Sequence, residues 1–183
     1  MRDLPVRRSV RLQWFDYTSV GAYFLTLVAF KRICHFGEME GDEVRLNPVG
    51  ELAAGVWREL PTWFPRLKLD SFIVMPNHMH GILVLEGLAR AKHPPQADAS
   101  PLPGSRSKGT DAGSVSAIVQ TLKALSTRRV HRLPGRAGLR LWQRGFYDHV
   151  VRDEEELNRI RTYIEQNPLR WALDRENPSG ESM

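Results

Sequence analysis

The sequence contains a single cysteine, Cys34, in 183 residues. One thiol can form neither an internal disulfide framework nor a zinc site with several cysteine ligands, so both classes of protein are excluded. The chain also lacks a run of about 18 apolar residues, the length that a membrane-spanning helix needs. No apolar segment follows the basic N-terminus, so no signal peptide is expected. We therefore expect a protein of the cytoplasm without a membrane partner.

Acidic residues are missing from one stretch, residues 114–147. This stretch carries seven Lys and Arg and hence a charge of +7, whereas the whole chain has a net charge of +5. A solvated surface normally mixes both signs, so the pattern indicates a surface that contacts nucleic acid, with an ordinary basic helix as the alternative. The side chains that we expect to contact nucleic acid are Lys123, Arg128, Arg129, Arg132, Arg140 and Arg144.

Three aromatic residues, Trp142, Phe146 and Tyr147, alternate with the last of these arginines. Stacking side chains next to cations are typical of proteins that bind single-stranded nucleic acid. The alternative is that Trp142 and Phe146 belong to the hydrophobic core.

The length and the 42% hydrophobic content fit one compact domain that can bury a core. Residues 87–113 differ from the rest, because these 27 residues contain four Pro and four Gly but only two large apolar side chains. Such a segment cannot offset the entropy of ordering, which predicts a flexible insertion. We expect a single domain over residues 1–183 that contains this insertion.

The hydrophobic patterns predict strands alternating with helices. Extended segments are expected at residues 23–30, 67–85 (one long strand) and 139–151 (a strand or strand pair), with a hairpin or irregular connection at 36–47. Helices are expected from the Asn47 cap to Pro61, from the Ser114 cap to Pro134, and from the Asp153 cap to Asn167. This order favours an α+β fold in which helices pack on a mainly antiparallel sheet.

Two histidines follow one another at positions i and i+2 in the segment Met75-Pro76-Asn77-His78-Met79-His80-Gly81. Side chains alternate across a strand, so His78 and His80 are expected on the same face, close enough to chelate one metal ion. The alternative is a pair of ordinary histidines on a half-buried strand.

The last predicted helix carries Tyr163 and Asn167, which lie on one helix face because they are four residues apart. A helix end over the histidine strand would deliver a nucleophile, Tyr163, together with a carbonyl-oxygen ligand, Asn167. Taken singly, each residue has a simpler explanation. Tyr163 would be a core aromatic, and Asn167 the residue that ends a helix before a proline.

These segments occur in an order that resembles a known family. MPNHMHGILV, then the basic helix AIVQTLKALSTRRV, then WQRGFYDHVVRDEEELNRIRTYIEQNP are similar to the single-tyrosine HUH transposases, most of all to the branch of REP-associated tyrosine transposases. The similarity covers about residues 23–171. It implies a ferredoxin-like (RRM-like) fold with the two histidines on a central strand and the tyrosine on the last helix.

The resemblance also implies a metal-dependent endonuclease and strand transferase that acts through a covalent 5′-phosphotyrosine. His78 and His80 match the HUH metal ligands and Tyr163 matches the catalytic tyrosine. Asn167 stands where relatives use Gln or Asn to complete the site for Mg²⁺ or Mn²⁺. The implied partner is single-stranded or hairpin DNA of the REP type. His149 also recurs in the branch, and we expect it to be a structural or phosphate-contacting residue rather than a third ligand.

Two other functions stay open at this point. One is a non-catalytic nucleic-acid-binding module with a ferredoxin-like fold, which would not need His78, His80, Tyr163 and Asn167 together. The other is an HUH nickase of replication or conjugation, against which the small size and the single Tyr-x-x-x-Asn element argue. The resemblance leaves open whether the protein is a monomer or a homodimer.

Overall fold

The computed structural model describes residues 18–87, 113–173 and 177. The expected insertion at 87–113 lies outside these residues except for its two terminal glycines, so the single-domain assignment stays a prediction. The strands are β1 (Gly21–Val28), β2 (Gly37–Glu40), β3 (Glu43–Leu46), β4 (Leu67–Val74), β5 (His78–Leu85) and β6 (Tyr147–Val151). The α-helices are α1 (Pro48–Trp63), α2 (Val115–Val130) and α3 (Glu154–Gln166), and the 3-10 helices are η1 (Phe30–Arg32) and η2 (Pro168–Leu173).

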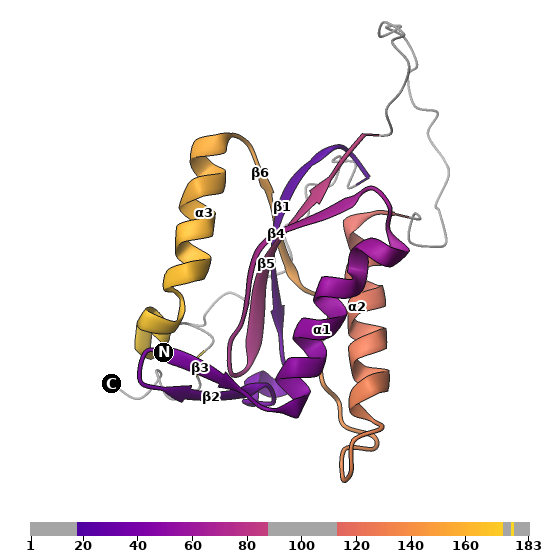
Figure 1. The fold of residues 1–183 in the computed structure, drawn as a ribbon, viewed down its shortest axis with the longest axis vertical. Helices are drawn as coiled ribbons and strands as arrows, with labels where there is room; N and C mark the ends of the chain where they lie inside the picture. The colour runs from indigo at the N-terminus through magenta and orange to yellow at the C-terminus, as the bar shows by residue number, and fades with distance from the viewer. Residues whose placement is uncertain (1–17, 88–112, 174–176, 178–183) are drawn as a thin grey trace, which may run out of the picture.

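Four strands form one sheet in the order β4-β5-β1-β6, and all neighbours in it are antiparallel. Helices α1 and α2 cover one face, and α3 lies on the other (Figure 1). The strands β2 and β3 form a separate hairpin. Without that hairpin the chain runs β1-α1-β4-β5-α2-β6, which is the ferredoxin-like arrangement. The expected α+β fold, with the two histidines on the central strand β5, is confirmed.

Local capping determines where the three helices begin. The Asn47 side chain accepts hydrogen bonds from the backbone N–H groups of Val49 and Gly50, and Pro48 occupies the first helical position, where a missing N–H costs nothing. Ser114 and Asp153 cap α2 and α3 in the same way. All three predicted helix starts are confirmed.

The predicted single strand over residues 67–85 is wrong. The segment forms two antiparallel strands, β4 and β5, joined by a tight turn in which the Met75 N–H donates to the His78 carbonyl at 2.8 Å. Pro76 explains the turn, because proline has no N–H to continue a ladder of backbone hydrogen bonds.

Three boundaries also differ from the prediction. Helix α1 continues past Pro61 to Trp63, because a proline in the last turn removes only one intrahelical bond. Helix α2 ends at Val130, before Pro134. Within 139–151 only β6 is a strand, while Trp142 forms an isolated bridge with Ala29.

The hydrophobic core lies between the sheet and helices α1 and α2. Strand β5 turns Met79, Gly81 and Leu83 toward this layer, and a Cβ on Gly81 would lie 2.5 Å from the Trp57 ring, which explains the glycine. Because side chains alternate along a strand, His78 and His80 face the opposite layer, where α3 lies. None of the helices in the described ranges is long and apolar enough to cross a membrane.

Candidate active site between the sheet and helix α3

His78 and His80 lie side by side on the face of β5 that α3 covers. Their Nε2 atoms are 3.1 Å apart, His78 is fully buried and His80 is almost so. Strand β1 contributes Thr26, which stands directly opposite His80 in the register of the sheet. Phe24, two residues earlier on β1, stacks on the His80 ring with 5.4 Å between ring centroids.

Neighbouring side chains orient both imidazole rings. The Asn77 amide nitrogen donates to the Arg32 carbonyl, so the amide oxygen faces His78 Nδ1 at 2.9 Å and accepts a hydrogen bond from its N–H. His80 Nδ1 lies 2.9 Å from the Thr26 hydroxyl, which can accept a hydrogen bond in the same way. With both Nδ1 atoms protonated, both Nε2 atoms carry lone pairs that face each other, an arrangement that a shared cation stabilises.

Burial favours the neutral, metal-binding form of His78. Desolvation lowers its pKa to about 3, and the interaction with the Asn167 side chain opposes this decrease only in part. Neutral imidazole is the form that binds metal ions, so His78 needs to lose no proton near pH 7.

Asn167, the residue that ends α3, completes a set of three potential ligands. Its side chain is buried, and its Oδ1 atom accepts no hydrogen bond of good geometry within the part of the chain that the structure describes. A buried carbonyl oxygen without a partner costs about 1–3 kcal/mol, which a bound cation would offset.

The spacing of the two histidines fits a metal ion. Two nitrogen ligands about 2.1 Å from one ion lie about 3 Å apart when they are neighbours at a right angle, and the Nε2 atoms are 3.1 Å apart. The described ranges contain no group of three or more His, Cys, Asp or Glu that could hold a metal ion. A cation here would therefore depend on the amide oxygen of Asn167 as its third protein ligand.

The Tyr163 hydroxyl also lies beside the histidine pair. The hydroxyl oxygen lies 3.4 Å from His80 Nε2, and the ring packs edge-on against Phe24 at 6.0 Å between centroids. The side chain is 38% exposed, whereas the next residue, Ile164, is buried in the protein. Tyr163 is thus accessible from solvent at the site rather than enclosed in the core.

Two polar links hold α3 across the sheet. Arg161 donates two hydrogen bonds, of 2.9 and 2.6 Å, to the Asp70 carboxylate on β4 and thereby lowers the pKa of Asp70 to about 2. Glu156 accepts from the Arg152 N–H and lies 2.9 Å from His149 Nε2 on β6. His149 therefore joins β6 to α3, and the two links fix the position of Tyr163 over His80.

The sequence analysis missed three residues that surround the histidines. Trp171 of η2 stacks on the His78 ring at 5.9 Å, while Phe24 and Thr26 contact His80. No local pattern marks these residues, since Phe24 and Thr26 reach the site through strand register and Trp171 through the 3-10 helix that follows α3. Asn77 carried a signal, because it directly precedes His78.

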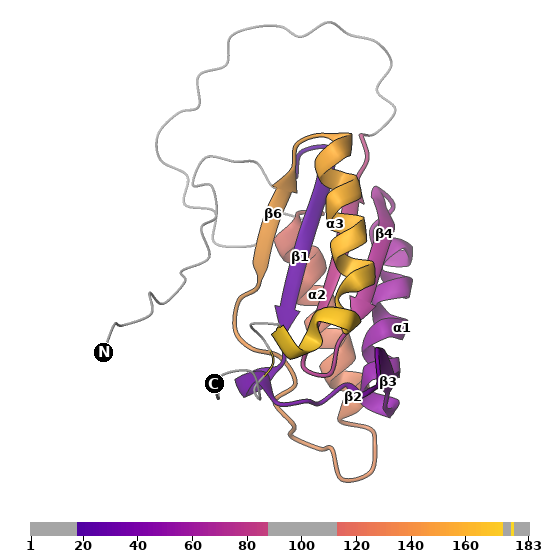
Figure 2. The same ribbon diagram turned by 90° about the vertical axis from the view of Figure 1, so that its left-hand side faces the viewer.

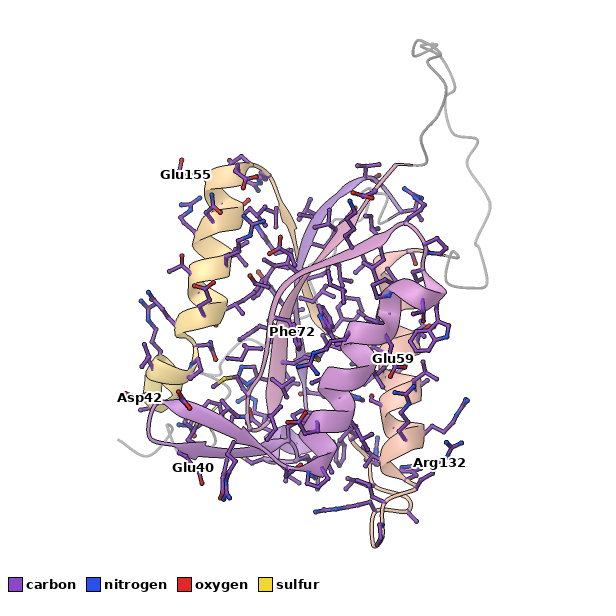
Figure 3. All side chains as sticks on the ribbon, viewed as in Figure 1. Glu40, Asp42, Glu59, Phe72, Arg132 and Glu155 are labelled. Atoms are coloured by element: carbon purple, nitrogen blue, oxygen red, sulfur yellow. The ribbon has the colours of Figure 1, made fainter. Side chains whose placement is uncertain are left out.

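The predicted DNA-contacting residues lie on helix α2, on the face of the sheet opposite α3, or in the segment that follows α2. Figure 3 shows Arg132 at the end of α2, across the sheet from Glu155 on α3. Lys123 donates to the carbonyls of Gln143 and Gly145, and Arg129 forms a two-point ion pair with Glu59. Among the predicted DNA-contacting residues, those with exposed side chains are Arg128, Arg132, Arg140 and Arg144. The structure does not bring the α2 residues to the histidine site.

The sequence is similar to a protein of Haemophilus influenzae described as an uncharacterized protein. The two are 35% identical over 170 residues, which cover 92% of this chain and 91% of that protein. The chain belongs to the same family as that protein. No family model matches the sequence.

Among solved structures, a REP-associated tyrosine transposase bound to a REP hairpin is similar to this chain. The TM-score is 0.53, the sequence identity is 18%, and the similarity covers 93% of this chain and 74% of that protein. At this identity the likeness shows the fold, which is transposase-like.

Proposed function

We propose that this protein is a metal-dependent single-stranded DNA endonuclease and strand transferase of the HUH transposase type, with Tyr163 as its nucleophile. The observation that carries the proposal is the convergence of three groups on one point. The Tyr163 hydroxyl lies 3.4 Å from His80 Nε2, which lies 3.1 Å from His78 Nε2. The transposase-like fold and the sequence resemblance support it. A binding module without catalysis has no physical need for this convergence.

The residues that would hold the divalent cation, Mg²⁺ or Mn²⁺, are His78, His80 and Asn167. When bound, such a cation supplies Lewis-acid stabilisation of the charge that develops on a phosphate under attack. The chain contributes the orientation of its ligands, because Asn77 and Thr26 hold the two Nδ1 atoms.

Tyr163 carries the covalent step in this proposal. The Tyr163 hydroxyl, which solvent can reach, gives its proton to water as its oxygen attacks the phosphorus. A bond forms between that oxygen and phosphorus, and the bond from phosphorus to the 3′ oxygen breaks. The 3′ oxygen leaves with the electron pair and takes up a proton. The 5′-phosphotyrosine keeps the energy of the phosphodiester, so a new 3′-hydroxyl can reverse the step and join a different strand.

The substrate that we propose is single-stranded or hairpin DNA. The solved structure with the similar fold is bound to a REP hairpin, and the exposure of Tyr163 leaves room for a strand to approach. Arg128, Arg132, Arg140 and Arg144 would contact phosphates, each through an exposed guanidinium. Lys123 and Arg129 would contribute less, since their cations already have partners within the protein.

The test is a cleavage assay on hairpin DNA taken from the flanks of the gene. We expect cleavage in Mn²⁺ or Mg²⁺ and none in EDTA. His78→Ala and His80→Ala should bind the hairpin but not cleave it, because the phosphate contacts lie elsewhere. Arg45→Ala, on the β2–β3 hairpin and paired with the neighbouring Glu38 and Glu40, is the control that should cleave normally. Hairpin binding by the wild-type protein without any cleavage would favour the binding module instead.

A further inference from the structure

The chain leaves strand β1 through a basic turn with strained backbone. Lys31 and Arg32 both have φ of 55°, in the left-handed region that residues other than glycine rarely adopt. Two such residues in succession cost free energy, and they persist only where the surroundings hold them in place. Figure 2 shows this turn at the end of β1, beyond the point of its arrow.

Hydrogen bonds tie this turn to the histidine site. The Ala29 N–H donates to the Asn77 carbonyl at 2.7 Å, and the Asn77 side-chain nitrogen donates to the Arg32 carbonyl at 2.9 Å. The oxygen of the same amide contacts His78. On the other side, the Phe30 N–H donates to the Leu141 carbonyl at 2.9 Å. One asparagine thus connects the strained turn directly to a proposed metal ligand.

Two cations share the aromatic ring of this turn. The Arg140 guanidinium lies 4.2 Å from the centroid of the Phe30 ring, and the Lys31 ammonium lies 5.7 Å from it. Both cations are exposed, and neither forms an ion pair with a carboxylate within the described residues. Like charges held near one ring repel each other, so an anion bound between them would be stabilised by both.

We propose that Lys31 and Arg140, held by the strained turn over Phe30, bind a backbone phosphate of single-stranded DNA beside the phosphate that is cleaved. The inference rests on the proposed function for the identity of the anion. Register places the turn next to the site, because Val28 pairs with His78 and the turn begins two residues later. The turn would thus hold one phosphate while Tyr163 attacks another.

The first test measures binding of a fluorescent single-stranded oligonucleotide in EDTA, so that neither metal nor cleavage contributes. Each phosphate contact on a single strand adds about 0.7 to the slope of log K against log salt concentration. Lys31→Gln and Arg140→Gln should each lower this slope, by no more than about 0.7, because both cations contact the same phosphate. Lys68→Gln is the matched control, because Lys68 lies at the end of β4 away from the histidines and its ammonium pairs with Glu86 at 2.6 Å. This variant should keep the wild-type slope.

The second test separates the charge from the backbone strain. Lys31→Gly removes the charge and also relieves the left-handed conformation, which glycine adopts freely. It should lose the same salt slope as Lys31→Gln but melt at a higher temperature. A lower melting temperature for Lys31→Gly would overturn the claim that the turn stores strain.

The outcomes for this inference and for the proposed function differ. Wild-type slopes in both Lys31→Gln and Arg140→Gln, in a protein that does cleave hairpin DNA, would overturn the phosphate site and leave the endonuclease standing. Reduced slopes in a protein that never cleaves DNA would support the phosphate site and overturn the proposed catalysis.

Discussion

Thr26 gives a direct test of how the site orients its ligands. Its hydroxyl lies 2.9 Å from His80 Nδ1, and both groups are buried. Thr26→Val preserves the shape of the side chain but removes the oxygen. The Nδ1–H of His80 would then be buried without a partner, or the proton would move to Nε2, the atom proposed to bind the cation.

The magnitude of this change follows from the general energetics of buried polar groups and of metal ligands. A buried donor left without a partner costs about 1–3 kcal/mol. Each 1.4 kcal/mol corresponds to roughly a tenfold change in affinity, and loss of a group that orients a metal ligand typically weakens metal binding by about 10–100-fold. We therefore expect Thr26→Val to bind Mn²⁺ about 10–100-fold more weakly than the wild-type protein.

The assay is a titration of free Mn²⁺ by electron paramagnetic resonance, without DNA. Thr26→Ser keeps the hydroxyl and should bind Mn²⁺ nearly as well as the wild-type protein. Thr162→Val is the second control, because the Thr162 hydroxyl lies on the exposed side of α3 and donates to the Asn158 carbonyl. Wild-type affinity in Thr26→Val, or equal losses in the Val and Ser variants, would refute the reasoning.

Two further predictions concern stability. Gly81→Ala should destabilise the protein by about 1–3 kcal/mol in urea unfolding, because its Cβ would lie 2.5 Å from the Trp57 ring. Gly55→Ala in α1, where a Cβ meets nothing within 4 Å, should be neutral or stabilising, and equal effects at both sites would contradict the packing argument. The ion pair with Arg161 lowers the pKa of Asp70 from 3.8 to about 2, so its stabilisation is complete above pH 3.8 and is lost as the pH falls toward 2. Arg161→Gln should remove about 1 kcal/mol near pH 7, since solvent screens this partly exposed pair, and should flatten the acid limb of a plot of stability against pH; an unchanged limb would exclude this role.

The sequence predicted those features that depend on neighbours in the chain. The caps Asn47, Ser114 and Asp153 mark helix starts because capping is a contact between adjacent residues. His78 and His80 share a face because the strand period is two. The split of residues 67–85 had a local signal in Pro76, which the continuous apolar pattern on both sides concealed.

Other features required the three-dimensional arrangement. Thr26 meets His80 only through the register of two strands 54 residues apart in sequence, and no local pattern sets that register. The basic helix α2 lies across the sheet from Tyr163, because α1 and α2 are crossover helices of one hand and share a face. Helix α3 follows the last strand and is free of that constraint, so its own packing on the sheet and its links through Asp70 and His149 determine where it lies.

Identification of the residue that becomes linked to DNA tests the central claim most directly. The wild-type protein would be incubated with single-stranded hairpin DNA and Mn²⁺, digested with protease and nuclease, and analysed by mass spectrometry. We predict a nucleotide adduct on Tyr163, its absence in Tyr163→Phe, and its persistence in Tyr147→Phe, whose exposed ring also packs on Phe24. An adduct on any other residue, or DNA cleavage that persists in Tyr163→Phe, would contradict the account.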